Sequence, residues 1–217
     1  QTTHFSVIDK WGNMVAYTTT IEQVFGSGIM VPEYGFMLNN EMTDFDAIPG
    51  GVNQVEPLKR PRSSMTPTIL LKDNQPFMAL GSPGGPTIIA KVAQTIINVI
   101  DHKMPIQKAI LTPVIYTAGY PTIRWEPGID QNTRLELMAK GHVFEEKPTY
   151  IGNVQAVIFD YENGQMYGGA DNTREGTVLG VDSIAYTSKK RNEIKEEKKG
   201  PFTVKVNGNV YPYETNQ

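Results

Sequence analysis

Thr2 opens the segment Thr-Thr-His-Phe-Ser at residues 2–6, which leads into a strand-like alternation. An N-terminal threonine can act as a complete nucleophile–base unit, because its hydroxyl attacks while the freed α-amine accepts the proton. An α-amine titrates at about 7.7–8.0, so a useful fraction of it is neutral at working pH. The same position also fits a strand end without any catalytic role.

A glycine-rich turn at residues 81–85, Gly-Ser-Pro-Gly-Gly, precedes a helical pattern. Such turns can cradle phosphates, but a P-loop requires a lysine that the segment lacks. Backbone N–H groups at a helix start stabilise negative charge, and the oxyanion of an acyl-transfer intermediate needs two such donors. An oxyanion therefore fits better than a phosphate, and a tight helix entry without a ligand is the alternative.

The elements that must position these groups begin with a β-hairpin. Residues 5–8 alternate apolar and polar positions, residues 9–13 supply turn residues, and residues 14–20 resume as a second strand. Antiparallel pairing brings the two strand ends together, so one of the threonines at 18–20 should approach Thr2. Residues 21–66 are rich in Gly, Pro, Asn and Asp and should form loops, where binding residues commonly lie.

Further along the chain, apolar periodicity and turn residues predict alternating strands and helices. The expected strands are 68–71, 76–80, 154–160 and 165–169, and the expected helices are 86–100, 105–111 and 132–140. This order indicates an α+β fold in which a layered sheet packs against helices.

Composition narrows the class of protein. The 217 residues carry a net charge of −3 and no cysteine, which excludes disulfides, thiolate metal sites and a cysteine nucleophile. No basic face for nucleic acid and no membrane-spanning apolar run is evident. His4, His102 and His142 lack metal-ligand spacing, so each is expected to be a surface or strand-end residue. No metal and no cofactor is expected.

The last part of the chain has a different character. Residues 189–199 form a mixed charge run, which is typical of solvated helix or linker. Residues 204–211 contain Asn-Gly within an alternating pattern and predict an added hairpin. We therefore expect a main domain at residues 1–183 and a C-terminal extension at residues 184–217.

Five sequence blocks in one order carry a resemblance to a known family. They are Thr2–Val7, Leu38–Met42, Asp44-Phe45, Lys59–Pro61 with Ser63–Pro67, and Gly81–Gly85. Together they resemble the small subunit of the γ-glutamyltransferases, which are N-terminal-nucleophile hydrolases cut from a longer precursor.

The resemblance implies an αββα sandwich completed by a large subunit. It assigns Thr2 as nucleophile, Thr20 as the threonine that touches it, and Gly84 and Gly85 as oxyanion donors. It also implies transfer or hydrolysis of γ-glutamyl groups from donors such as glutathione, with water, an amino acid or a peptide as acceptor. A secreted or cell-surface location follows from the family as well.

Recognition of a γ-glutamyl donor needs anions for its α-ammonium and donors for its α-carboxylate. The resemblance assigns Asp44 and Glu41 to the ammonium and the serines Ser63 and Ser64 to the carboxylate. Glu22 supplies a third acid on the same loops. Some family members carry amides in place of Glu22 and Glu41, so the division of work among the three acids stays open.

Three features complete the expectations from sequence. The family's carboxylate-binding arginine comes from the large subunit, so the partner should be the other part of the same precursor. Gln1 would acylate the Thr2 amine if it were retained, whereas self-cleavage should expose Thr2 as the first residue. Gln1 therefore marks either an unprocessed or engineered chain end or incomplete cleavage, and the sequence leaves both open. The short segment at residues 46–58 lacks the lid of some relatives, which leaves poly-γ-glutamate as an alternative substrate. A non-catalytic β-rich binding domain is the alternative of another class.

Overall fold

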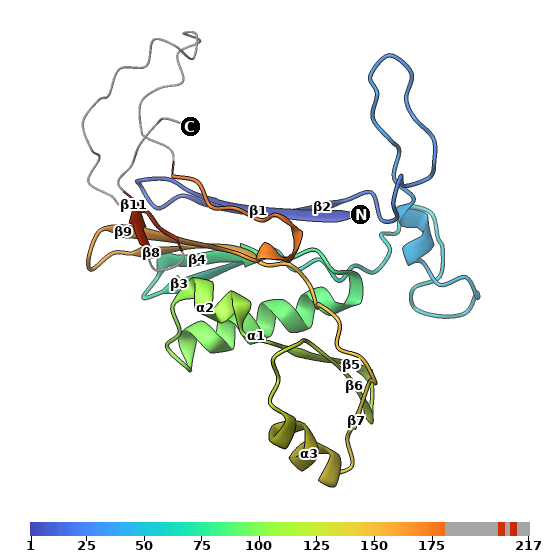
Figure 1. Cartoon of the computed structure of the whole chain (residues 1–217). Coiled ribbons are helices and arrows are strands. Elements are labelled where there is room, and N and C mark those ends of the chain that lie inside the picture. Colours follow the sequence, from blue (N-terminus) through green and yellow to red (C-terminus); the bar gives the residue numbers. More distant parts are fainter. Residues whose placement is uncertain (181–203, 207–208, 212–217) are drawn as a thin grey trace.

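The computed structural model describes residues 1–180, 204–206 and 209–211, and these residues form stacked layers (Figure 1). A two-stranded sheet of β1 (Thr2–Ile8) and β2 (Met14–Thr20) lies on a six-stranded sheet, whose other face is covered by helices. The six-stranded sheet has the order β11-β10-β9-β8-β4-β3. Its strands are β3 (Thr68–Lys72), β4 (Gln75–Gly81), β8 (Gln155–Asp160), β9 (Gln165–Ala170), β10 (Val204–Val206) and β11 (Asn209–Tyr211). The predicted α+β class is confirmed.

The β1–β2 hairpin forms as the alternation predicts, and Thr2 is the first residue of β1, as expected. Its turn is closed by Asp9, whose carboxylate accepts hydrogen bonds from the backbone N–H groups of Trp11 and Asn13, both at 2.9 Å. The register places Thr2 opposite Thr20. Because side chains alternate along a strand, the even-numbered residues of β1 face the six-stranded sheet.

The main core lies between the six-stranded sheet and two helices. α1 (Ile88–Ile100) and α2 (Ile106–Leu111) lie against the sheet face opposite β1 and β2 (Figure 1). Apolar residues at helical spacing on α1 pack onto the buried side chains of β4. This core contains Met78, Leu80, Ile88, Val92, Val99, Ile106, Ala109, Ile110, Val154 and Ala156. A short 3-10 turn at Gly85–Thr87 leads into α1, so the predicted helix start near Pro86 is confirmed.

A smaller lobe follows α2, and its strands were not predicted from the sequence. It consists of β5 (Ile115–Gly119), β6 (Thr122–Trp125), β7 (Val143–Phe144) and α3 (Gln131–Ala139). Its own small core contains Ile123, Trp125 and Phe144. The predicted helix at 132–140 is confirmed, with a start one residue earlier, where Asp130 caps it by accepting a hydrogen bond from the Thr133 N–H.

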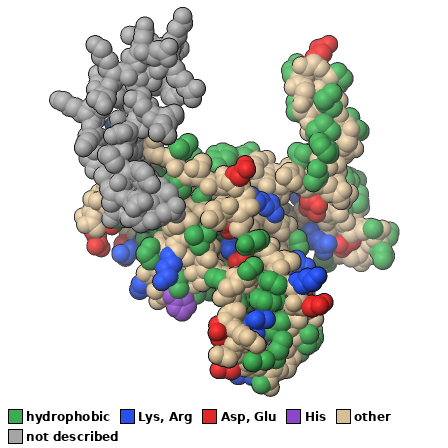
Figure 2. All heavy atoms as spheres, in the orientation of Figure 1, with side chains coloured by type: hydrophobic (Ala, Val, Ile, Leu, Met, Phe, Trp, Pro, Cys, Tyr) green, Lys and Arg blue, Asp and Glu red, His purple; other side chains and the backbone are tan. Residues whose placement is uncertain are grey.

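The segment between β2 and β3 consists of loops, as predicted, with one 3-10 turn at Glu41–Asp44. Part of it projects away from the layers (Figure 1). Apolar side chains are exposed along this projection, and Figure 2 shows them as a patch on its surface. They include Val24, Phe25, Ile29, Met30, Tyr34 and Phe36. Exposed apolar patches are common at surfaces that bind another molecule.

The C-terminal strands β10 and β11 pair antiparallel, and β10 adds to β9 in parallel. The predicted hairpin pairing is therefore confirmed, whereas its turn at 207–208 and the charge run at 189–199 lie outside the described residues. The proposed domain boundary at 183/184 also lies there and stays a prediction. No helix in the described ranges is long and apolar enough to cross a lipid bilayer.

Candidate active site

The threonine pair at the hairpin end is the centre of the candidate site. Thr2 Oγ1 donates a hydrogen bond to Thr20 Oγ1 at 3.0 Å, and the backbone N–H of Glu22 donates to the same Thr20 oxygen at 2.8 Å. Both threonine side chains are half-buried. The expectation that a threonine of the second strand approaches Thr2 is confirmed, and the strand register selects Thr20.

The Gln1 carbonyl lies in the same network. Its oxygen accepts hydrogen bonds from Thr20 Oγ1 at 3.2 Å and from the Ile21 N–H at 3.4 Å. The Thr20 hydroxyl donates its single proton to the Gln1 carbonyl oxygen. The oxygen of the same hydroxyl accepts the hydrogen bond from Thr2. The peptide bond between Gln1 and Thr2 is thus held directly beside the candidate nucleophile.

The glycine pair adopts backbone conformations that favour glycine, with φ of 142° at Gly84 and 57° at Gly85. A Cβ on Gly84 would lie 2.8 Å from Thr87 Oγ1 and 2.9 Å from Gly152 Cα, so a side chain there has no room. Within the described part of the chain, neither glycine N–H donates a hydrogen bond. Two free N–H groups on a fixed turn suit an oxyanion.

The three predicted acids come together. The carboxylates of Glu22, Glu41 and Asp44 lie within 4.8 Å of one another. Glu22 adopts a left-handed conformation, with φ of 67°, which is uncommon for a residue with a Cβ and turns the chain out of β2. One oxygen of Glu41, Oε1, is buried without a hydrogen-bond partner in the described structure. A buried anionic oxygen without a partner fits an incoming ammonium group.

The pKa of Glu41 is raised above its ordinary value. Burial is the largest cause, followed by the negative charges of Asp44 and Glu22 and a hydrogen bond with Asp44. The positive charge of the chain's amino terminus acts in the opposite direction. The acids therefore lie within electrostatic range of the Gln1–Thr2 end of β1, although far from it in sequence.

The serine pair connects to the glycine turn. Ser64 Oγ donates to the Gly85 carbonyl oxygen at 2.8 Å, and Ser63 Oγ accepts from the Met65 N–H at 3.2 Å. Within the described residues, no hydrogen bond joins either serine to the acids. Ser64 thus helps to hold the turn that carries the oxyanion donors.

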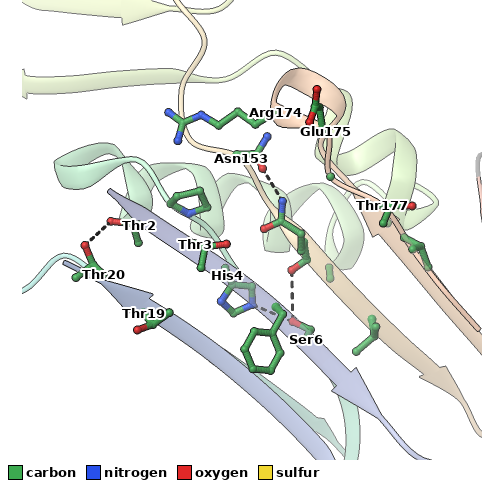
Figure 3. Close-up of a pocket in the computed structure, with 18 of the residues that line it drawn as sticks. Thr2, Thr3, His4, Ser6, Thr19, Thr20, Asn153, Arg174, Glu175 and Thr177 are labelled. Atoms are coloured by element: carbon green, nitrogen blue, oxygen red, sulfur yellow. Dashed lines mark hydrogen bonds between the residues drawn. The ribbon is translucent and has the colours of Figure 1, made fainter. Parts of the chain in front are cut away.

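A groove of about 650 Å³ runs along β1 from Thr2 (Figure 3). Its walls include residues 2–6 of β1, Asn153, residues 155–157 and the segment 174–179. The acids, the serine pair and Gly84–Gly85 do not line this groove. The acids on the loops after β2 are therefore separate from the groove along β1.

His4 corrects an expectation from the sequence. We expected a surface or strand-end residue, but His4 is buried, and its pKa is lowered to about 4 because burial disfavours the charged imidazole. Its Nδ1 lies 2.7 Å from Thr18 Oγ1. Its Nε2 lies 2.9 Å from Ser6 Oγ, and Figure 3 shows this second contact. His102 is exposed and His142 is half-buried. The signal for His4 was its even-numbered position in β1, shared with Thr2.

A buried charged group beneath the glycine turn was also missed. Lys91 Nζ lies 3.0 Å from Glu126 Oε2 and 3.8 Å from Asp171 Oδ2, and all three side chains are buried. Glu126 also accepts hydrogen bonds from the backbone N–H groups of Val114 and Ile151. These bonds compensate the buried charges and fix the segment beside Gly152, against which Gly84 packs.

A threonine at the head of β1 and a glycine-rich turn in a layered α+β fold match the N-terminal-nucleophile hydrolase class that the sequence resemblance implies. A sequence profile described as Gamma-glutamyltranspeptidase matches residues 1–181. The chain belongs to the γ-glutamyltranspeptidase family.

Individual relatives agree with this assignment. The chain is 54% identical over 182 residues to a glutathione hydrolase proenzyme of Bacillus subtilis strain 168, an alignment that covers 84% of this chain and 31% of the relative. The corresponding Escherichia coli K12 proenzyme is 40% identical, with 79% of this chain and 31% of the relative covered. The structure of the γ-glutamyltranspeptidase of Pseudomonas nitroreducens complexed with L-DON matches with a TM-score of 0.76 and 32% identity. That match covers 83% of this chain and 100% of the other. The chain spans about a third of the length of the two proenzymes.

Proposed function

We propose that this chain is the catalytic part of a γ-glutamyltransferase that forms a γ-glutamyl ester on Thr2. The observation that carries the proposal is the 3.0 Å hydrogen bond between the Thr2 and Thr20 hydroxyls at the end of β1. Family membership supports the reaction class, which includes transfer to an acceptor and hydrolysis.

In the acylation step, Thr2 Oγ1 attacks the γ-carbonyl carbon of the donor. Its proton passes to the α-amine of Thr2, which is available once the bond to Gln1 has been cleaved. Thr20 fixes the direction of the Thr2 hydroxyl, and the Glu22 N–H holds the Thr20 oxygen in place. The leaving amine then takes the proton from the α-ammonium as the ester forms.

The tetrahedral intermediate carries a negative charge on the former carbonyl oxygen. The N–H groups of Gly84 and Gly85 are the donors for this charge, because the described residues leave them unbonded and their backbone is fixed. Such preorganised donors contribute about 3–4 kcal/mol each to transition-state stabilisation in acyl-transfer enzymes. Ser64 supports the turn through the Gly85 carbonyl.

The loops after β2 recognise the γ-glutamyl donor in this proposal. The carboxylates of Glu22, Glu41 and Asp44 form an anionic cluster that suits the α-ammonium of a γ-glutamyl group. Ser63 and Ser64 are the candidates for its α-carboxylate. Deacylation by water gives hydrolysis, and deacylation by the amine of an amino acid or peptide gives transfer. The groove along β1 gives such an acceptor access to Thr2.

The partner of this chain is, in our proposal, the remaining two thirds of the precursor. The two relatives named above are proenzymes three times as long as the matched part. The exposed apolar patch on the projection after β2 supports a large protein partner. Cleavage between Gln1 and Thr2 would release the α-amine. A secreted or cell-surface location is part of the same proposal.

Glutathione is the donor that we propose first, because the named relatives are glutathione hydrolases. Poly-γ-glutamate is a second candidate. Residues 46–58 form a short, mostly exposed loop in which a backbone bridge joins Asp46 to Gln54, and so little chain is available to cover a bound donor.

The test of the proposed function is turnover of a γ-glutamyl amide by the full precursor after maturation. Product release, together with loss of that release in Thr2→Ala, supports the proposal. A mature, folded protein that turns over no γ-glutamyl donor contradicts it.

A further inference from the structure

His4 connects the strand of the nucleophile to the turn that carries the oxyanion donors. Thr2, His4 and Ser6 share the inner face of β1, so the imidazole lies between the two sheets. A Cβ on Gly81 would lie 2.4 Å from both Cε1 and Nδ1 of His4, which shows that the ring packs directly against the Gly81 backbone. Gly81 is the last residue of β4 and the first of the glycine-rich turn.

Hydrogen bonds fix the orientation of the imidazole. Ser6 Oγ donates to the Gln155 carbonyl oxygen at 3.4 Å, so the Ser6 oxygen is free to accept from His4 Nε2–H. His4 Nδ1 then accepts from the Thr18 hydroxyl. The resulting chain runs from β2 through β1 to β8, and Gln155 pairs with Gly81 in the six-stranded sheet. The ring therefore has a single position relative to the start of the turn.

We propose that His4 is a positioning residue, whose imidazole sets the separation between the Thr2 hydroxyl and the Gly84–Gly85 donors through its contact with Gly81. The inference rests on the proposed acyl-transfer function. Donor recognition is assigned to Glu41, Asp44 and the serines, which lie on other loops. A change at His4 should therefore act on the chemical step, measured by kcat, more than on donor binding, measured by KM.

A double-mutant cycle tests the contact. Gly81→Ala in the wild-type background should lower kcat at least about tenfold, because its methyl group displaces the ring, and a shift of about 1 Å near the chemistry can cost a hundredfold. In a His4→Ala background, which removes the ring, the same Gly81→Ala change should alter kcat by less than about twofold. His4→Gln, which keeps a donor and an acceptor, should retain more kcat than His4→Ala. KM should stay within about twofold throughout.

The controls use positions without this contact. Gly119→Ala is the matched glycine change, since a Cβ there meets no atom within 4 Å, and His102→Ala replaces an exposed histidine. Both should leave kcat and KM unchanged. All proteins are made as full precursors, with folding checked by circular dichroism and rates normalised to the mature fraction.

If a variant does not mature, the rate of its self-cleavage on gels is compared in the same cycle, since cleavage also uses Thr2. Rescue of Gly81→Ala by His4→Ala in either measurement supports the proposal. An equal effect of Gly81→Ala in both backgrounds, or a change confined to KM, overturns it. Turnover by the wild-type protein separately tests the proposed function, so the two failures are distinguishable.

Discussion

Thr20 faces Thr2 across the β1–β2 pair, and the two hydroxyl oxygens lie 3.0 Å apart. The two residues are 18 positions apart in the sequence, and only the hairpin register brings them together. In our proposal this contact orients the hydroxyl that attacks the donor, and the Glu22 N–H holds the Thr20 oxygen.

Replacement of Thr20 tests this contact. Thr20→Ala should lower kcat by about five- to a hundredfold, because losing one partner of a part-buried hydrogen bond costs about 1–3 kcal/mol. Thr20→Ser keeps the hydroxyl and should retain most of the activity. Steady-state kinetics of the mature protein measures both, with Thr122→Ala, an exposed threonine of β6 outside the groove, as the control. Equal activity of the Thr20→Ala and wild-type proteins would remove Thr20 from the mechanism.

Asp44 should be required for donor binding. Asp44→Ala leaves the donor ammonium without a counter-charge, a loss of about 2–5 kcal/mol for a desolvated pair. We expect kcat/KM for a γ-glutamyl amide to fall about a hundredfold or more while the fold survives. Glu136→Ala, on exposed α3, is the matched control and should have no effect. An unchanged kcat/KM in Asp44→Ala would transfer the ammonium site to Glu22 or Glu41.

The raised pKa of Glu41 predicts a pH dependence of ligand affinity. Burial, and then the negative charges of Asp44 and Glu22, disfavour the charged form, so Glu41 takes up a proton at a higher pH than an ordinary carboxyl group. A bound ammonium group favours the charged form of the Glu41 carboxylate. The affinity for such a ligand is therefore present above the pKa of Glu41 and is lost as the pH falls through that pKa.

The probe for this effect is 2-aminohexanoate, which keeps the α-ammonium and α-carboxylate but has no γ-carbonyl. Its inhibition constant should rise on acidification, and Glu41→Gln should flatten that rise. Glu136→Gln should leave the profile as in the wild type. A profile that is identical in Glu41→Gln and the wild type would assign the titration to another group.

The short loop at residues 46–58 predicts access for a polymeric donor. We expect measurable cleavage of poly-γ-glutamate alongside glutathione hydrolysis, measured as product release at matched concentrations of γ-glutamyl ends. If glutathione is consumed and the polymer stays intact even at high enzyme concentration, the open-site argument is wrong. A loop of the partner chain would then have to cover the donor.

Local patterns predicted much of the fold. Period-two alternation on both sides of a turn fixed the β1–β2 hairpin and with it the pairing of Thr2 with a threonine of β2. Helical spacing from Ile88 to Ile100 and the Asn163-Gly164 turn predicted the elements that enclose the main core. The strands of the small lobe, beginning at Ile115, were missed because they are short and two of them are irregularly paired.

The site residues differ in how far sequence could identify them. Glu41 and Asp44 were found through family blocks, and Glu22 was named as a third acid on the same loops. The proximity of the three depends on the loop path after β2, which no periodicity describes. His4 and Lys91 were not identified as buried. Lys91 meets Glu126 from 35 positions away, and in sequence it is indistinguishable from a solvated lysine.

The central claim is that Thr2 carries the γ-glutamyl group, and peptide-level mass spectrometry tests it most directly. The mature protein is mixed briefly with excess donor, quenched in acid and digested. Our account predicts that the chain begins at Thr2 and that its first peptide gains the mass of one γ-glutamyl group. Thr2→Ala should yield an uncleaved precursor without the adduct. Turnover by a protein that retains Gln1, or an adduct on any other residue, would contradict the account.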